Sequence, residues 1–446
     1  MARVCFFLAS LAAFLLASHN LTAAPAGASR QSLPLRWGYY VADDPASLAS
    51  LRQRSGDLDY VALHWATTKR DGSLEVKGTP EVIQVVRSIG ARPILSVSLD
   101  GGAEAAHSFL SADDLRAAAI ENLARALADY DGISIDFEGL YPEDREPLTR
   151  LVAQLATRLR PAGKLVTVAL SAKTSDTRTG WAGAIDYAGL APHADLFILM
   201  AYGYRTSRSS IPGSVAPMPW VESCLSFAVS QIPPAKILLG VPLYGYDWNT
   251  TTGPPARALR HPDAMAIANQ QGASVQHDPV QQSAHFAYSR DGHSHEVWFE
   301  DQFTVDAKAA LVSRYGLGGV ATWRLGHEDP GVWQAINRRL GREVTRPVQP
   351  TSTPSPGAGS SWYFAEGSTA PPFDTWLLLQ NPGASPANVR LTFMPESGGT
   401  LVRDVTVPPT SRTSIFANQI VSGAAFGTRI EADQPIFAER AMYAGF

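Results

Sequence analysis

Two acidic residues follow an apolar stretch at a spacing suited to acid–base chemistry. Asp136 and Glu138 close the segment 131–138, whose sequence is DGISIDFE. If this segment is a β-strand, Ser134, Asp136 and Glu138 share one face, and the two acids lie roughly 6.5 Å apart. Two anions at that separation disfavour each other, so we expect one of the acids to keep its proton near neutral pH. A carboxylic acid that stays protonated can act as a general acid.

Aromatic residues end later apolar segments with the same spacing of two. Met200 and Tyr202 end one segment, Tyr244 and Tyr246 end the next, and Trp323 ends the last. Residues spaced by two on a strand face the same way. Aromatic rings suit the apolar face of a sugar, and acids bond its hydroxyl groups, so this set favours a carbohydrate ligand. Any one of these rings, taken alone, could instead fill the protein core.

The elements that must position these residues are short apolar strands that alternate with helical segments, such as 79–89, 112–129 and 143–159. Near-continuous apolar strands with helices between them predict a parallel sheet covered on its outside. Eight such units over about 300 residues favour an α/β fold of the (β/α)8 TIM barrel type over an open sheet, with the active site at the carboxyl ends of the strands. We expect the strands at 35–41, 60–66, 92–99, 132–140, 164–172, 195–202, 236–246 and 318–325.

A long interval between the last two strands predicts a small α+β insertion at about 249–304. It contains a helical pattern at 262–271 and short β-like segments at 284–288 and 296–299, and a helix at 305–315 follows it. His285, His293 and His295 lie within it, but their spacing matches no strong metal-ligand pattern. The surroundings are typical of a hairpin around Asp291, so we expect no metal.

The two ends of the chain differ in composition from the barrel segment. Residues 345–361 are rich in Pro, Ser and Thr and predict an extended linker, and residues 362–446 contain short β-like segments typical of an all-β sandwich domain. Residues 1–28 have the form of a secretory signal peptide, with cleavage expected near Ala24 or Ala28. An uncleaved membrane anchor is the alternative. Cleavage would remove Cys5 and leave Cys224 as a buried helical residue, with no disulfide within the chain.

The overall composition excludes few functions but favours none that depend on charge. Hydrophobic residues make up 45% and charged residues 17% of the 446 residues, and the formal net charge is −4. This balance is typical of an ordinary globular protein. Nothing in it favours a nucleic acid or an anionic membrane surface as a partner.

The segment 131–138 resembles the D-x-x-D-x-D-x-E signature of glycoside hydrolase family 18, the chitinase-like (β/α)8 enzymes. Segments 200–203 (MAYG) and 318–323 (GGVATW) are similar to two further motifs of this family. Segments 236–248 and 295–301 look like the branch of bacterial spore cortex and cell-wall glycosidases. The resemblance covers residues 33–342.

The resemblance implies a substrate-assisted retaining glycosidase that cleaves β-1,4 bonds next to N-acetylated amino sugars, in peptidoglycan or chitin. Glu138 would be the general acid, Asp136 would hold the 2-acetamido group, and Tyr202 would bond its oxygen. Such a mechanism requires no cofactor. The residues expected to line the substrate site are Trp323, as its floor, and Met200, Ser134, Tyr244, Tyr246 and Trp298.

Two departures from the family pattern leave a second interpretation open. Ser134 replaces a carboxylate, although its hydroxyl can still bond Asp136, and Gly203 replaces the Asp of the motif M-x-Y-D. These changes favour a noncatalytic chitin- or peptidoglycan-binding protein on the same barrel, whereas the retained Asp136, Glu138 and Tyr202 favour an active enzyme. A purely structural role would leave costly buried carboxylates without a purpose.

The segments 361–369 and 376–383 resemble β-sandwich repeats of secreted bacterial surface proteins. That likeness implies an accessory module that associates with the cell wall or surface and carries no chemistry. Together with the expected signal peptide, it predicts a bacterial protein that is secreted or associated with the cell wall, with no membrane span in the mature chain.

Overall fold

The computed structural model describes residues 33–180, 182–342 and 359–444. The expected signal peptide at 1–28 and most of the expected linker at 345–361 lie outside the described residues. Among the helices that are described, none combines the length and the apolar composition that crossing a membrane requires.

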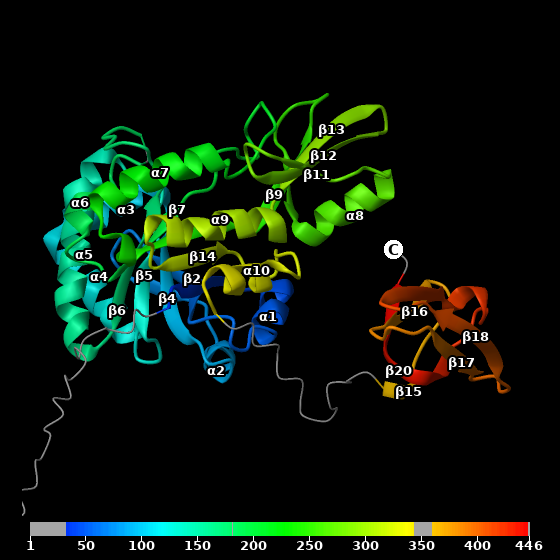
Figure 1. The fold of residues 1–446 in the computed structure, drawn as a ribbon. Helices are drawn as coiled ribbons and strands as arrows, with labels where there is room; N and C mark the ends of the chain where they lie inside the picture. The colour runs from blue at the N-terminus through cyan, green and yellow to red at the C-terminus, as the bar shows by residue number, and fades with distance from the viewer. Residues whose placement is uncertain (1–32, 181, 343–358, 445–446) are drawn as a thin grey trace, which may run out of the picture.

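Eight parallel strands close into a barrel, which confirms the predicted fold class (Figure 1). The first and last strands in the chain pair with each other, and β1 also pairs with β2, so the sheet has no open edge within the barrel. A short antiparallel strand, β3 (Leu74–Val76), extends β2 as a hairpin. The barrel strands are β1 (Leu35–Val41), β2 (Tyr60–Thr68), β4 (Arg92–Leu99), β5 (Gly132–Ile135), β6 (Leu165–Ser171), β7 (Leu196–Met200), β8 (Ile237–Pro242) and β14 (Gly319–Trp323).

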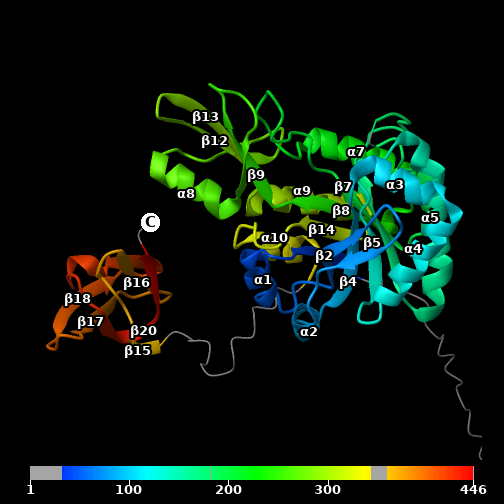
Figure 2. The same cartoon turned by 180° about the vertical axis from the view of Figure 1, so that it is seen from behind.

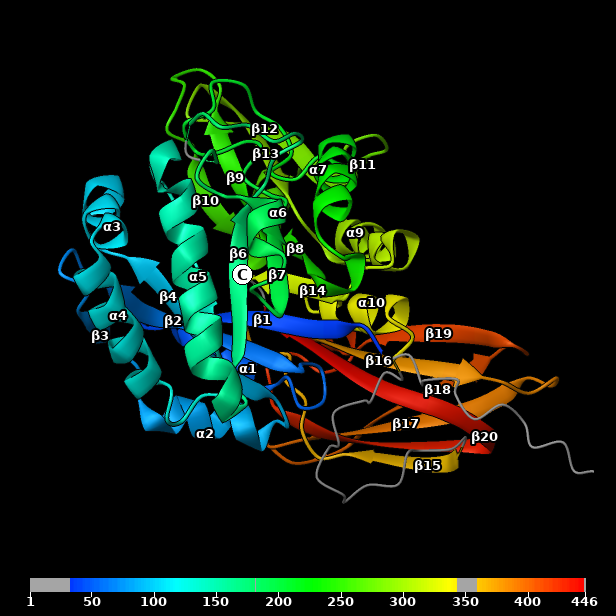
Figure 3. The same ribbon diagram turned by 90° about the vertical axis from the view of Figure 1, so that its left-hand side faces the viewer.

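Helices cover the outside of the barrel, as Figures 2 and 3 show for α3, α4 and α5 beside β4, β5 and β6. In α5 the buried residues recur every three or four positions, which gives the helix one apolar face. The helices of the barrel are α1 (Pro45–Arg52), α2 (Pro80–Ser88), α3 (Gly102–Ser111), α4 (Asp113–Ala126), α5 (Arg145–Leu159), α6 (Tyr187–Leu190), α7 (Met218–Gln231), α9 (Gln302–Tyr315) and α10 (Val332–Arg339), with short 3-10 turns at Pro142–Asp144, Arg160–Ala162 and Pro234–Lys236.

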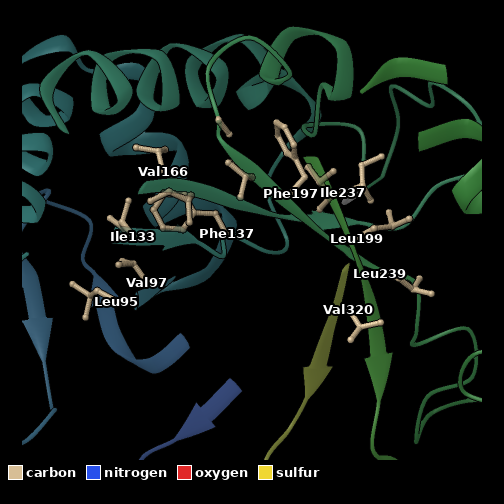
Figure 4. Close-up of a cluster of buried hydrophobic side chains, with 14 of the residues drawn as sticks. Leu95, Val97, Ile133, Phe137, Val166, Phe197, Leu199, Ile237, Leu239 and Val320 are labelled. Carbon is tan, nitrogen blue, oxygen red and sulfur yellow. The ribbon is translucent and has the colours of Figure 1, made fainter. Parts of the chain in front are cut away.

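Alternate residues of each strand serve two different cores. Side chains such as Val97, Ile133 and Leu199 point outward and pack beneath the helices (Figure 4). Their neighbours in sequence point inward and fill the barrel, as Ile94 and Ile198 do. This alternation explains why the strands are apolar on both faces and why a polar side chain on the inward face is conspicuous.

Two expected strands end earlier than the sequence suggested. Strand β5 stops at Ile135, and the backbone N–H of Asp136 makes one further bond to the carbonyl of Val97 at 2.9 Å, so Asp136 and Glu138 follow the strand rather than close it. Strand β8 stops at Pro242, and the chain leaves the barrel there. Tyr244 and Tyr246 therefore belong to a separate strand, because the apolar pattern of 236–246 continues across the point where the chain changes sheets.

The insertion between the last two barrel strands is an α+β lobe, as predicted, and its first strand begins at Tyr244 instead of about residue 249. Its antiparallel sheet has the order β10-β9-β13-β12-β11 and packs on α8, with Leu259, Ile267 and Phe299 in its core. The predicted hairpin around Asp291 joins β12 to β13. The elements are β9 (Tyr244–Asn249), β10 (Arg257–Arg260), α8 (His261–Gln271), β11 (Gln276–Asp278), β12 (Ser283–Arg290) and β13 (His293–Phe299).

The C-terminal module is built only of antiparallel strands around its own apolar core, which includes Leu377, Leu391 and Ile430. Its last strand pairs with β15 and β17 along its first part and with β16 along its second. This last strand, Phe426–Ala444, is therefore shared by both parts of the module. The elements are β15 (Gly359–Phe364), β16 (Phe373–Asn381), β17 (Ala387–Pro395), β18 (Leu401–Val407), β19 (Ser411–Phe416), a 3-10 turn (Ala417–Gln419) and β20 (Phe426–Ala444).

Candidate active site

The carboxyl ends of the barrel strands bring the expected polar and aromatic residues to one mouth of the barrel. Asp136 and Glu138 directly follow β5, Tyr202 follows β7, and Met200 and Trp323 are the last residues of β7 and β14. Neighbouring parallel strands end at the same rim, so residues distant in the sequence converge there.

Asp136 is the buried acid of the site. Its side chain is 6% exposed, and no described group lies within hydrogen-bond distance of its Oδ1 atom. Burial, with a smaller contribution from the charge of Glu138, raises the pKa of Asp136 from 3.8 to about 7. Since an unpaired carboxylate is costly in a barrel interior, this acid is poised between its two protonation states near neutral pH.

Glu138 is the accessible acid, because its side chain retains an exposed surface at the mouth of the barrel. Desolvation in the cleft raises the pKa of Glu138 above its usual value. The sequence suggested the neighbouring anion as the cause of the raised pKa, but burial is the cause at Glu138 and the main cause at Asp136, where the charge of Glu138 adds a smaller contribution.

Tyr202 follows β7 at the same rim as the two acids. Burial raises the pKa of its hydroxyl well above 10, and the charges of Asp136 and Glu138 raise it further. The hydroxyl therefore stays protonated and available as a hydrogen-bond donor. The ring of Tyr202 lies edge-on to Tyr244, with their centroids 6.4 Å apart.

A cavity of about 440 Å³ lies between the barrel rim and the inserted lobe. Trp323, Tyr244 and Tyr246 line it, and the ring centroids of the two tyrosines are 5.7 Å apart. Aromatic rings beside charged and imidazole groups can hold the apolar faces and the hydroxyl groups of a sugar. The remaining lining residues are Ala258, Leu259, Arg260, Asp263 and His327.

Ser134 and Met200 lie beneath the mouth and not at its surface. Ser134 is fully buried, and its Oγ atom has no partner among the described groups, so the expected hydrogen bond to Asp136 is not formed. The reason is its position in the sheet: Ser134 pairs with Ser96 and Thr167 inside the barrel, two residues before Asp136. Met200 is 9% exposed and closes the same interior.

Trp298 is not brought to the cavity. Its side chain is 6% exposed and packs with Trp248 and Ala256 inside the lobe. It stacks on His285 at 4.4 Å, and its Nε1 atom donates to Glu296 Oε1 at 2.6 Å. The side chain of Trp298 therefore packs inside the lobe beside Tyr246, its partner on β9.

Sequence reasoning missed several residues at this mouth. Arg260, Asp263 and His327 line the cavity, but no local pattern marks them because they come from the lobe and from the loop after β14. The sequence could have indicated His64, because it lies two residues after Ala62 and four after Tyr60 on β2, and both of these point into the barrel.

The fold and the site define a class of protein: a (β/α)8 barrel with two acids after its fourth barrel strand and a tryptophan at the end of its eighth. The model of the family described as Glycosyl hydrolases family 18 matches residues 36–328. The chain belongs to this family and carries a glycoside hydrolase domain, which confirms the resemblance seen in the sequence.

Curated relatives lie in the branch that the sequence suggested. The cortical fragment-lytic enzyme of Bacillus anthracis is 32% identical over 63% of this chain and 67% of its own length. The cortical fragment-lytic enzyme of Bacillus subtilis (strain 168) is 36% identical over 46% of this chain. The chain spans about half the length, 48%, of that second relative.

Solved structures agree with these relatives. The spore cortex-lytic enzyme SleL of Bacillus megaterium QM B1551 has a TM-score of 0.64 at 28% identity, covering 69% of this chain and 74% of that one. A chitinase from Chromobacterium violaceum ATCC 12472 has a TM-score of 0.65 at 29% identity, covering 69% of this chain and 99% of that one.

Proposed function

We propose that this protein hydrolyses β-1,4 bonds next to N-acetylated amino sugars, in peptidoglycan or chitin, by substrate-assisted retaining catalysis. The observation that carries the proposal is the convergence of Asp136, Glu138 and Tyr202 at one barrel mouth, beside the cavity that Trp323 lines. Family membership supports the reaction class, and the names of the relatives support the substrate class.

Glu138 is the proton donor in this proposal. It transfers its proton to the glycosidic oxygen while the carbonyl oxygen of the substrate's 2-acetamido group attacks the anomeric carbon. The bond to the leaving sugar breaks, and an oxazolinium ring forms. The ionised Glu138 then takes a proton from water, whose oxygen opens the ring at the anomeric carbon with net retention.

Asp136 and Tyr202 hold the acetamido group. The free Oδ1 atom of Asp136 accepts the amide N–H, and the hydroxyl of Tyr202 donates to the amide oxygen. A hydrogen bond to the ionised form of Asp136 favours that form. Substrate binding therefore favours the state in which Asp136 is ionised and Glu138 keeps its proton, which is the state that the reaction needs.

A noncatalytic glycan-binding protein is the alternative, and Ser134 and Gly203 favour it because both replace acids of the family pattern. Gly203 has a φ angle of +79°, in the left-handed region that glycine adopts without strain.

Hydrolysis of N-acetylglucosamine oligomers and of peptidoglycan by the wild type and by Glu138→Gln tests the proposal. We expect turnover by the wild type and a fall of about 10²–10⁴-fold in the variant, because a general acid contributes about that much. Equal, negligible turnover by both proteins with measurable glycan binding would establish the binding protein instead. De-N-acetylated oligomers should resist cleavage, and their efficient hydrolysis would exclude the substrate-assisted mechanism.

We propose that the C-terminal module associates with cell-wall polysaccharide. On the outward face of its β16–β19 pair, Trp376 and Phe416 stack with centroids 4.6 Å apart. Exposed Phe437 and Tyr443 lie on the adjoining part of β20. Loss of sedimentation with insoluble peptidoglycan in the full-length Trp376→Ala protein, with hydrolysis of soluble oligomers unchanged, is the expected result, and unchanged sedimentation would contradict it.

We also propose action outside the cell, either secreted or at the cell wall, on the basis of the sequence of residues 1–28. N-terminal sequencing of the exported protein should find it cleaved after Ala24 or Ala28. An intact leader in the membrane fraction would support the anchor instead.

A further inference from the structure

His64 lies beside the buried acid. Its Nδ1 atom lies 3.6 Å from Asp136 Oδ2 and 3.0 Å from Ser96 Oγ. Its ring lies edge-on to Trp323, with centroids 5.3 Å apart at 90°. These contacts fix the ring between the acid and the proposed sugar floor.

The local structure explains how a histidine reaches this position. His64 is aligned with Ser96 on β4, and Ser96 is aligned with Ser134 on β5, so the three residues form one inward layer of the barrel. The register between β2 and β4 shifts just after His64, between His64 and Ala66. A β-bulge of this kind re-aims the side chains beside it.

No other described side chain reaches the carboxylate of Asp136. Its Oδ1 atom has no partner, and the Oγ atom of Ser134 has none either. The hydroxyl of Tyr39 is buried beside Ser134 in the same part of the barrel. Thus the residue that replaces the family's carboxylate does not bond Asp136, whereas the Nδ1 atom of His64 lies 3.6 Å from its Oδ2 atom.

We propose that His64 is the positioning residue of Asp136: its Nδ1 atom, which lies 3.6 Å from Oδ2 and so beyond hydrogen-bond length, closes on Oδ2 when substrate binds and leaves Oδ1 free for the amide N–H of the substrate. This inference rests on the proposed function. The imidazole takes over the task that a carboxylate at position 134 cannot perform in this chain.

The surrounding charges suit a neutral imidazole. Burial, and the nearby guanidinium of Arg324, lower the pKa of His64. A neutral ring donates one N–H without adding a positive charge that would oppose the oxazolinium cation. Besides Asp136 and Arg324, the titratable groups around His64 are Glu138 after β5, Tyr39 on β1 and Tyr202 after β7.

Steady-state kinetics on N-acetylglucosamine oligomers test the positioning role. In His64→Ala we expect kcat to fall about 10–100-fold with KM changed less than about threefold, by analogy with residues that orient catalytic ligands. In His64→Asn the amide nitrogen occupies the place of Nδ1, and most of the lost kcat should return. His193→Ala is the control, because His193 precedes β7 at the opposite end of the barrel.

Three results would overturn the inference. They are an unchanged kcat in His64→Ala, a loss confined to KM, and failure of His64→Asn to recover activity while it retains the wild-type melting temperature. A loss confined to KM would identify His64 as a sugar contact instead.

A titration without substrate separates this inference from the proposed function. The pKa of Asp136, followed by NMR in the wild type and in His64→Ala, should be higher in the variant by more than about half a unit, since the N–H of a neutral His64 stabilises the ionised carboxylate. His193→Ala serves as the reference variant and should leave the pKa of Asp136 unchanged. An unchanged pKa of Asp136 in His64→Ala would overturn the contact, whereas a wild type inactive on every N-acetylated glycan would overturn the proposed function alone.

Discussion

The two acids of the site differ in burial and not in chemical type. Asp136 is enclosed with one oxygen unpaired, whereas Glu138 reaches the surface of the cleft. A residue that holds a substrate amide benefits from enclosure, and a residue that exchanges protons with a leaving group and with water needs access. The proposed division of roles therefore follows from position within one short segment.

The buried acid should cost stability, and Asp136→Asn should recover it. The unfolded chain releases this proton near pH 3.8 and the folded protein near pH 7, so stability falls between these values and the loss is complete above about pH 7. We expect Asp136→Asn to melt at a higher temperature than the wild type at pH 8, with a smaller difference at pH 4. The same gain at both pH values would contradict a titration effect. Asp114→Asn, at an exposed position, is the control.

The hydroxyl of Tyr202 should matter more than its ring. Tyr202→Phe keeps the edge-on contact with Tyr244 and removes only the donor to the acetamido oxygen. We expect kcat to fall about 10²–10³-fold, as for the loss of one donor to a developing charge. Tyr204→Phe, two residues further on and exposed, should retain full activity. A Tyr202→Phe variant with wild-type kcat would remove Tyr202 from the mechanism.

At the scale of elements, the inserted lobe determines the length of the cleft. Tyr246 belongs to β9 and lines the cavity together with Trp323, and neither acid is among the residues that line this cavity. Tyr246→Ala should therefore raise KM for long oligomers several-fold with little effect on kcat, and hydrolysis of the shortest cleavable oligomer should change less. Val280→Ala, at an exposed position of the same lobe, is the control. A fall in kcat alone would show that Tyr246 acts at the bond that is cut.

A buried ion pair joins the lobe to the barrel helix α9. Lys308 Nζ lies 2.7 Å from Glu300 Oε2, and both side chains are almost fully enclosed. Lys308→Met leaves Glu300 without a counter-charge and should lower the free energy of unfolding by about 3–5 kcal/mol. The double variant with Glu300→Leu should lose much less, since no uncompensated charge remains. Arg150→Met breaks an exposed pair with Glu146 and should cost under about 1 kcal/mol. Additive losses in the double variant would contradict this account.

At the scale of the whole molecule, the barrel and the C-terminal module have separate apolar cores. A chain that ends at residue 342 should therefore fold and hydrolyse soluble oligomers at the wild-type rate. It should lose sedimentation with insoluble peptidoglycan if the module binds the wall. Calorimetry of the full chain should show two transitions, one of which disappears on truncation. A barrel that fails to fold without the module would contradict their independence.

The sequence by itself determined the barrel, the lobe, the all-β module and the family, because these depend on periodicity and on motifs within short segments. It also proposed Asp136, Glu138, Tyr202 and Trp323 as site residues, since local spacing sets which way they face. Trp298 was proposed with them from its spacing, and the structure encloses its side chain in the lobe.

Only the tertiary structure decided the environment of each side chain. It showed that Asp136 is the enclosed acid, that Ser134 does not bond it, and that His64 lies beside it. Burial and distances between residues 72 positions apart depend on how strands come together, and no local pattern encodes them. The pKa of an acid depends on that environment. The sequence could therefore name both acids but could not say what raises the pKa of each.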